Sequence, residues 1–184
     1  MGRRGRTYLT DENFFFVTTT VVRFLNVFSD PKVCDLLIDN IKYYQSKYHF
    51  TILAYVIMPS HFHWIVEVQP KLGTISEIMR DIKKRSAWDI MEYLKHNNLY
   101  KEVFETEAEQ YPDQERKFWM KRFDDEVIRK QRMLWTKIKY IHNNPVKAGI
   151  VEEPEDYKYS SARNYINEDH SVLTVDTEIA GIEL

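Results

Sequence analysis

Two strand-like segments of this sequence are separated by only two residues. Phe50–Met58 (FTILAYVIM) and His61–Val68 (HFHWIVEV) are rich in β-branched and aromatic residues, which favour strands. Between them lies Pro59-Ser60, a pair of turn-forming residues. Because so short a connection suits antiparallel neighbours, the sequence predicts a hairpin and therefore an antiparallel sheet.

Strand-like and helix-like patterns alternate around this hairpin. Asn13–Val22 (NFFFVTTTVV) is a predicted strand, and Pro31 opens a predicted helix with Ser29 or Asp30 as its N-cap. A second helix is predicted over Ile75–Leu94, because its apolar residues recur at intervals of three and four. The two helices thus follow the first and the third predicted strand.

The second half of the chain begins with a segment of different character. Lys101–Gln114 shows no period, so we predict a loop within an acidic insertion over 101–116. Lys117–Ile128 resumes strand character, and Gln131–Asn144 has the spacing of a helix, which Pro145 stops. The order β-α-β-β-α-β-α predicts an α+β fold with the split βαβ antiparallel sheet of ferredoxin-like domains. Helices are expected on one face of this sheet, with the other face free for a ligand.

The chain length favours one domain. A chain of 184 residues is long enough for one hydrophobic core, whereas two cores would each be small. We expect a single domain over 1–184, with a basic N-terminal tail over 1–12 and a polar C-terminal tail over 167–184. Cys34 is the single cysteine and has no internal disulfide partner, which fits a cytoplasmic location. No apolar run approaches the roughly 20 residues that span a bilayer, so no membrane segment is expected.

Charge is segregated along the chain. The net charge of -2 argues against bulk electrostatic coating of nucleic acid. From Lys117 to Lys147, however, nine basic residues stand against three acidic ones. This segment permits one positive face for a polyanion, and ordinary solvated helix faces are the alternative.

The sharpest local signal for chemistry is His61-Phe62-His63. Alternate residues of a strand project to the same side about 7 Å apart, so both imidazoles can face one ion. Phe62 and Trp64 belong to the apolar face, which leaves the histidines on the other face, where we expect them to be presented rather than buried. Glu67 lies roughly 13 Å further along the strand, too far to be a third ligand. The alternative is a pair of surface histidines without a ligand.

The predicted helix over Gln131–Asn144 offers two more polar groups. Tyr140 and Asn144 are four residues apart, so they lie one turn from each other on one face, about 5 to 6 Å apart. A phenol and an amide placed there can meet the histidine pair. Packing also explains Tyr140, since the chain has 12 tyrosines.

The strongest pointer to a function is a set of sequence blocks in a fixed order. These are Tyr55–Trp64 (YVIMPSHFHW), Phe118–Ile128 (FWMKRFDDEVI), Tyr140–Val151 (YIHNNPVKAGIV), Pro154–Tyr157 and Ser160–Arg163. From about Tyr8 to Ile166 the chain resembles the REP-associated tyrosine transposases of the HUH single-tyrosine transposase superfamily. The resemblance implies a metal-dependent enzyme that nicks and joins single-stranded DNA through a 5′-phosphotyrosine intermediate.

The resemblance also implies roles for individual residues. Tyr140 is the expected nucleophile, and the expected ligands of a divalent metal, Mg²⁺ or Mn²⁺, are His61, His63 and Asn144. The expected partner is single-stranded DNA with hairpin structure, bound by a monomer or a homodimer. Independently of the resemblance, Lys137, Lys139 and Lys147 are candidate contacts to DNA phosphates because they are near Tyr140 in the sequence, and ordinary solvated helix lysines are the alternative. Arg122 and Arg129 are further candidate contacts to the DNA.

Three features depart from the family pattern. Glu126 stands where the family's Asp-His-Val-Ile block has histidine, Ser60 stands where Asn or Asp is usual, and the acidic insertion is longer than expected. Two other functions stay open at this point: a noncatalytic single-stranded nucleic-acid-binding module of the same fold, and a zinc hydrolase that uses His61 and His63.

Overall fold

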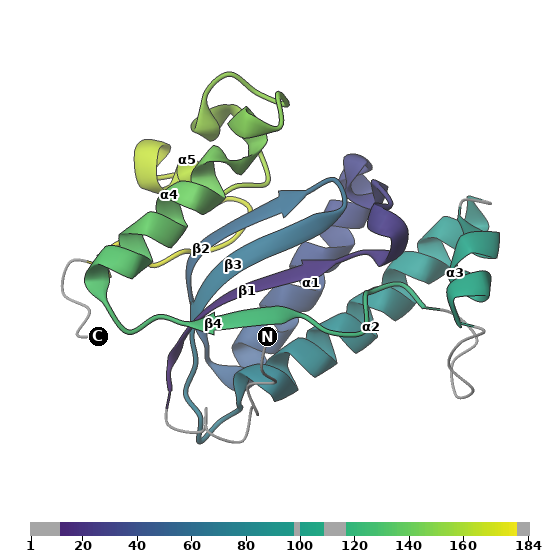
Figure 1. The fold of residues 1–184 in the computed structure, drawn as a ribbon, viewed down its shortest axis with the longest axis horizontal. Helices are drawn as coiled ribbons and strands as arrows, with labels where there is room; N and C mark the ends of the chain where they lie inside the picture. The colour runs from purple at the N-terminus through teal and green to yellow at the C-terminus, as the bar shows by residue number, and fades with distance from the viewer. Residues whose placement is uncertain (1–11, 98–99, 109–116, 180–184) are drawn as a thin grey trace, which may run out of the picture.

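A four-stranded antiparallel sheet forms the centre of the fold (Figure 1). The computed structural model describes residues 12–97, 100–108 and 117–179. Its strands are β1 (Phe14–Thr20), β2 (Thr51–Met58), β3 (His61–Glu67) and β4 (Asp124–Val127), in the order β2-β3-β1-β4. The first and third strands are therefore central, as a split βαβ unit requires, and the predicted α+β class is confirmed.

The predicted hairpin is present with its two-residue connection. Met58 of β2 pairs with His61 of β3, so only Pro59 and Ser60 lie between the strands. Along β3 the side chains alternate as predicted: Phe62 and Trp64 belong to the core on one face of the sheet, and Ile65 belongs to the core on the other face.

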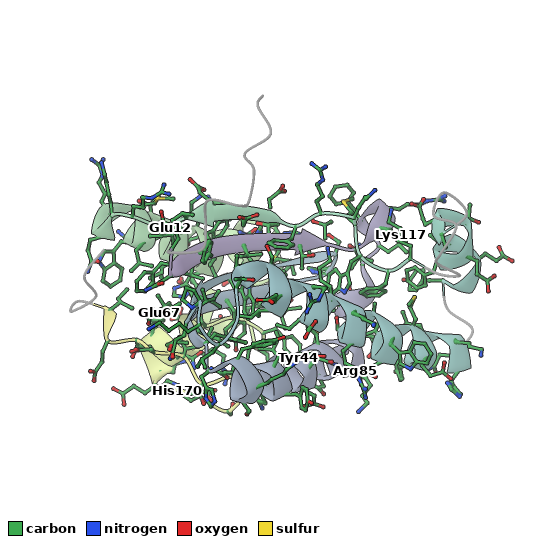
Figure 2. The ribbon with its side chains drawn as sticks, turned by 90° about the horizontal axis from the view of Figure 1, so that it is seen from below. Glu12, Tyr44, Glu67, Arg85, Lys117 and His170 are labelled. Carbon is green, nitrogen blue, oxygen red and sulfur yellow. The ribbon has the colours of Figure 1, made fainter. Side chains whose placement is uncertain are left out.

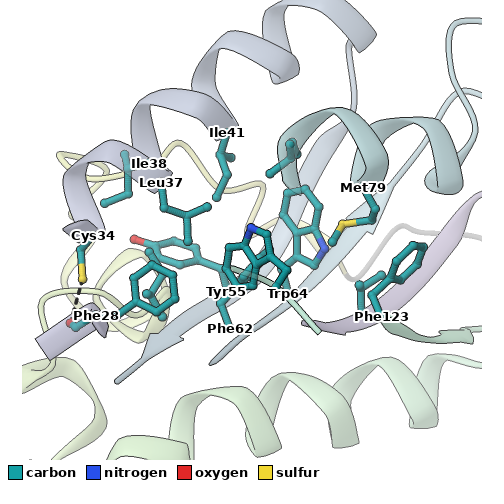
Figure 3. Close-up of a cluster of buried hydrophobic side chains, with 14 of the residues drawn as sticks. Phe28, Cys34, Leu37, Ile38, Ile41, Tyr55, Phe62, Trp64, Met79 and Phe123 are labelled. Carbon is teal, nitrogen blue, oxygen red and sulfur yellow. Dashed lines mark hydrogen bonds between the residues drawn. The ribbon is translucent and has the colours of Figure 1, made fainter. Parts of the chain in front are cut away.

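Helices α1 (Pro31–Tyr48) and α2 (Ile75–His96) cover one face of the sheet, where they bury Phe62 and Trp64 (Figure 3). The Asp30 side chain caps α1 by accepting a hydrogen bond from the backbone N–H of Lys32. A capping box between Thr74 and Glu77 begins α2. Tyr44 and Arg85 lie in this helical layer (Figure 2).

The second face of the sheet is not free, contrary to the prediction. Helix α4 (Gln131–Lys147) lies across it, on the side of the sheet opposite α1 and α2 (Figures 1 and 3). Leu134, Ile138 and Ile141 are at most 2% exposed and pack in a second core with Phe16 and other residues of the sheet. The apolar stripe of α4 needs a partner, and the apolar second face of β2 provides it.

The predicted end of helix α4 before Pro145 is wrong, because the helix contains Pro145 and continues to Lys147. Pro145 has no N–H and so removes one hydrogen bond from the helix. Because Pro145 is buried, its packing offsets the cost of that lost bond. The helix ends at a Schellman motif: Gly149 has φ +67°, and the N–H of Ile150 donates to the carbonyl of Pro145.

The predicted loop over Lys101–Gln114 is also wrong in part, because Lys101–Ala108 forms helix α3. Its buried residues Phe104 and Ala108 are four apart, and the ring of Phe104 lies 5.4 Å from that of Phe118. Two buried apolar positions in an acidic segment are too few for a period to be recognised. Residues 109–116 lie outside the described ranges.

The strand predicted over Lys117–Ile128 is short, since only Asp124–Val127 pairs as β4. Before β4 the chain is irregular apart from a bridge between Trp119 and Val21. After β1 come two 3₁₀ turns, η2 (Val22–Phe24) and η3 (Val27–Ser29).

The C-terminal segment closes the free edge of β2. It contains η4 (Pro154–Asp156) and α5 (Ala162–Asn167), and backbone hydrogen bonds join Tyr159 and Ser161 to β2. Three residues of the tail predicted as polar are buried, namely Leu173, Val175 and Ile179. Of the predicted N-terminal tail, residues 1–11 lie outside the described ranges. No helix within the described ranges has the length and apolar character needed to cross a membrane.

Candidate functional site

The structure brings His63 of β3 and Tyr140 of α4 together, although they are 77 positions apart in the sequence. The Tyr140 hydroxyl lies 3.5 Å from Nε2 of His63, and the two ring centroids are 5.3 Å apart. Tyr140 itself is 41% exposed. A phenol that is accessible to a ligand therefore stands directly beside an imidazole.

The prediction that His63 is presented to solvent is wrong. The residue is buried, with only 4% of its surface exposed. Helix α4 covers the face of the sheet on which it lies. Burial, with smaller contributions from His61 and Lys137, lowers the pKa of His63 to about 3. The imidazole is therefore neutral near pH 7, which is the form that ligates metals.

His61 lies beside His63, as the alternation of β3 predicts, with their ring centroids 4.8 Å apart. Burial lowers the pKa of His61 as well. Its Nδ1 lies 3.1 Å from the hydroxyl of Ser60 in the hairpin turn. Two neutral imidazoles thus project from one strand, and each has Nδ1 engaged by a neighbouring hydroxyl.

The hydroxyl that engages His63 belongs to Thr18, a residue that the sequence reasoning missed. Thr18 of β1 pairs directly with His63 in the sheet, and its Oγ1 lies 2.7 Å from Nδ1 of His63. This contact turns Nε2 toward Tyr140. No local pattern in the run Thr18-Thr19-Thr20 distinguishes the residue, because only strand register shows which threonine meets the histidine.

Phe16 is a second residue that sequence reasoning missed. Its ring stacks on His63 with centroids 5.6 Å apart and meets Tyr140 edge-on at 5.9 Å. Because the ring contacts both, it restricts the positions of the imidazole and the phenol.

The exposed flank of α4 supplies the other predicted groups. Asn144 donates from its side-chain nitrogen to the carbonyl of Tyr140 at 3.2 Å, which leaves its carboxamide oxygen available. The ammonium of Lys147 lies 5.9 Å from the centre of the Tyr140 ring. The ammonium of Lys137 lies 4.4 Å from the centre of the Phe16 ring. Two lysines therefore bracket the nucleophile candidate.

The other predicted DNA contacts do not lie beside the Tyr140 side chain. The guanidinium of Arg129 pairs with Glu12 at 2.5 Å, and Glu12 lies near β4 and α4 (Figure 2). Lys139 is exposed on α4, about 100° around the helix from Tyr140. Arg122 is exposed two positions before β4 begins. The structure thus groups Lys137 and Lys147 with Tyr140 but does not group Lys139, Arg122 or Arg129 with it.

The donor set at the histidine pair is compatible with a divalent cation. Within the described ranges, no three His, Cys, Asp or Glu side chains come together to hold a metal ion. A cation held by His61 and His63 would need further donors, for which the sequence predicts the amide oxygen of Asn144, one turn after Tyr140, together with oxygens of water and substrate. Such a mixed nitrogen and oxygen set suits Mn²⁺, and Mg²⁺ likewise keeps several waters in proteins.

Comparison with known proteins gives the family of the chain and a similar fold. The family described as "Transposase IS200 like" matches residues 13–144. A protein from Haemophilus influenzae, named as a REP-associated tyrosine transposase, is 26% identical over 114 residues, which is 62% of this chain and 60% of that protein. The chain thus matches less than two thirds of the length of that relative.

A solved structure of a REP-associated tyrosine transposase bound to a REP hairpin has the same fold. It superposes with a TM-score of 0.67 and 21% identity, and the match covers 100% of this chain and 98% of that one. The resemblance that the sequence blocks indicate is confirmed. Because the family match spans most of the chain, from β1 through Asn144 of α4, this protein belongs to the family of IS200-like transposases.

Proposed function

We propose that the protein is a metal-dependent enzyme that nicks and joins single-stranded DNA through a covalent bond to Tyr140. The observation that carries this proposal is the distance of 3.5 Å between the Tyr140 hydroxyl and Nε2 of His63 in one chain. Tyr140 is accessible, whereas the histidine that meets it is buried and oriented by Thr18.

In the proposed reaction the Tyr140 oxygen attacks the phosphorus of a DNA phosphodiester. A bond from that oxygen to phosphorus forms, and the bond from phosphorus to the 3′ oxygen breaks. The phenol gives up its proton, and the departing 3′ oxygen takes one up as a hydroxyl. Attack by a 3′-hydroxyl on the 5′-phosphotyrosine bond reverses these steps and joins a strand, because the phosphodiester energy is conserved.

His61, His63 and Asn144 would hold the divalent cation. When bound, the cation stabilises the negative charge that develops on the scissile phosphate. Lys137 and Lys147, on the same flank of α4 as Tyr140, contact the DNA backbone and position it. Burial keeps both imidazoles neutral, so the metal does not compete with protons near pH 7.

The proposed substrate is single-stranded DNA with hairpin structure. The support is the similarity in fold to a REP-associated tyrosine transposase bound to a REP hairpin. One chain supplies both the phenol and an imidazole beside it, which supports a site within a single chain. We therefore propose an active site that is complete in a monomer.

The alternative of a noncatalytic nucleic-acid-binding module finds less support. Such modules stack bases on aromatic residues of an open sheet. Here α4 packs across the second face, and the Phe16 ring on that face is 9% exposed.

Denaturing gel electrophoresis with a labelled hairpin oligonucleotide and Mn²⁺ tests the proposal. The wild-type protein should form a covalent adduct that survives denaturation, and Tyr140→Phe should form none while it still binds the oligonucleotide. Tyr43→Phe is the matched control, because Tyr43 is 64% exposed on α1, a helix on the other face of the sheet. An adduct with Tyr140→Phe at the wild-type level refutes the assignment.

A further inference from the structure

An ion pair joins β4 to α4 beside the candidate site. The Glu126 carboxylate of β4 lies 2.6 Å from the Lys137 ammonium of α4, with the side chains 49% and 25% exposed, respectively. Glu126 is the residue that departs from the histidine of the family pattern. The structure therefore gives Glu126 a specific partner, Lys137, which lies one turn before Tyr140 on α4.

Lys137 is close to the groups that would act on DNA. Its ammonium lies over the Phe16 ring at 4.4 Å, and that ring contacts both His63 and Tyr140. Lys137 and Tyr140 are three positions apart, so the two project from one flank of α4. The charge of Lys137 reaches the site, since it helps to lower the pKa of His63.

The charge along this part of the sequence is one-sided. From Val127 to Val151 the chain has six Lys or Arg residues and no Asp or Glu. Glu126 is the last acid before this stretch, and its side chain turns to Lys137. It therefore neutralises one cation of an otherwise uniformly basic segment at the point where that segment meets the site.

An ion pair as exposed as this one is easily exchanged. Pairs between exposed side chains change an equilibrium by only about 1.4- to 5-fold, because water and salt screen them. A DNA phosphate offers Lys137 an oxygen anion of the same kind as the Glu126 carboxylate. A strand that reaches Tyr140 also brings phosphates within one helical turn of Lys137.

We propose that Glu126 is an internal counter-ion that positions Lys137 in the free protein, and that a backbone phosphate of single-stranded DNA displaces its carboxylate. The inference rests on the proposed function, because it takes DNA as the ligand at this site. It adds a role for Glu126 and makes DNA binding a competition between two anions for one ammonium.

A purely structural role for the pair predicts something different. If the pair only ties α4 to β4, its loss lowers thermal stability and leaves DNA affinity unchanged. If Glu126 only repels DNA, its neutralisation tightens binding whether or not Lys137 is present. A counter-ion, by contrast, acts through Lys137, so the effect of Glu126 depends on that lysine.

A double-mutant cycle separates these cases. The dissociation constant of a fluorescent hairpin oligonucleotide is measured by anisotropy at several salt concentrations for Glu126→Gln, Lys137→Gln and the double variant. All carry Tyr140→Phe, so that binding is measured without cleavage. Glu126→Gln should tighten binding about two- to fivefold. Lys137→Gln should weaken it and reduce the slope of log K against log salt by about 0.7, the value for one phosphate of a single strand.

The result that decides is the effect of Glu126→Gln in the Lys137→Gln background, which should be less than about 1.5-fold. Asp124→Asn is the matched control, because Asp124 is exposed on β4 and pairs with Thr18, whose side chain faces the site. Asp124→Asn reports the general repulsion between an acidic side chain and DNA, so it should change the affinity equally in both backgrounds. Equal tightening by Glu126→Gln in both backgrounds, or no change in affinity in either, overturns the counter-ion assignment.

The outcome for the proposed function is separate. Absence of a covalent adduct with the wild-type protein would disprove the nicking activity, yet the binding cycle would still report whether a phosphate takes Lys137 from Glu126. Conversely, adduct formation with an additive cycle would support the enzyme and disprove the role of Glu126.

Discussion

The hydroxyl of Thr18 lies 2.7 Å from Nδ1 of His63, across the central strand pair of the sheet. Because Nδ1 is engaged there, the other ring nitrogen of His63 faces Tyr140 at 3.5 Å. Contacts of this kind fix the tautomer and the orientation of metal-binding histidines in proteins.

Replacing Thr18 by Val removes the hydroxyl and keeps the shape of the side chain. The affinity of the protein for Mn²⁺ should fall about 10- to 100-fold, as for the loss of other groups that orient metal ligands. Titration calorimetry measures the affinity directly, and adduct formation should fall with it. Thr18→Ser restores a hydroxyl and should recover most of the affinity, so equal losses in both variants would exclude orientation through the hydroxyl.

Loss of either histidine should remove metal-dependent cleavage. His61→Ala and His63→Ala should each abolish the covalent adduct, as should chelation of divalent cations with EDTA in the wild-type protein. Oligonucleotide binding should be retained, since Lys137 and Lys147 are unchanged. Adduct formation at the wild-type rate by His61→Ala, or in EDTA, would contradict the proposed metal site.

His142 of α4 makes stability depend on pH. Its Nε2 lies 2.9 Å from the hydroxyl of Ser161, and burial lowers its pKa to about 4. The folded pKa is below the ordinary value near 6.5, so the stabilisation is complete above about pH 6.5 and decreases as the pH falls toward 4. Urea unfolding should show this group removing about 2 kcal/mol between pH 7 and pH 5.

His142→Gln should reduce that decrease, because the glutamine amide does not titrate. The burial of His61 and His63 lowers their pKa values too, so part of the pH dependence should persist in the variant. An unchanged pH dependence of the unfolding free energy in His142→Gln would show that His142 is not the titrating group.

Helix α4 is held on the sheet by apolar contacts. Ile141 is fully buried there, next to Tyr140 in sequence. Ile141→Ala should lower the free energy of unfolding by about 2 to 5 kcal/mol, through lost burial and the cavity that remains. Ile166→Ala is the control, since Ile166 is 54% exposed and its loss should change stability by less than about 0.5 kcal/mol. A small effect of Ile141→Ala would mean that α4 packs loosely.

The end of α4 depends on the backbone freedom of Gly149, which has φ +67°. A Cβ at this position would meet nothing within 4 Å, so only backbone strain opposes a side chain. Gly149→Ala should therefore lower the free energy of unfolding by about 1 to 2 kcal/mol. Gly149→Asn should lower it less, because Asn tolerates left-handed backbone better. Thermal unfolding of the two variants gives the comparison, and equal stability would argue against strain.

The features predicted correctly are those that short stretches of sequence determine. A two-residue connection produces the hairpin of β2 and β3, and the period of two along β3 puts His61 and His63 on one face. The spacing of four along α4 likewise puts Tyr140 and Asn144 on one flank. These patterns depend only on the dihedral angles of neighbouring residues, so they can be read from the chain itself.

Contacts between residues far apart in the chain could not be predicted, because they depend on how the elements pack. The position of α4 across the second face buries His63 and brings Tyr140 to it over 77 residues. Strand register places Thr18 opposite His63, and the packing of α4 near β4 pairs Glu126 with Lys137. Such contacts follow from which apolar surfaces pack together, and periodicity within one segment carries no information about its partner.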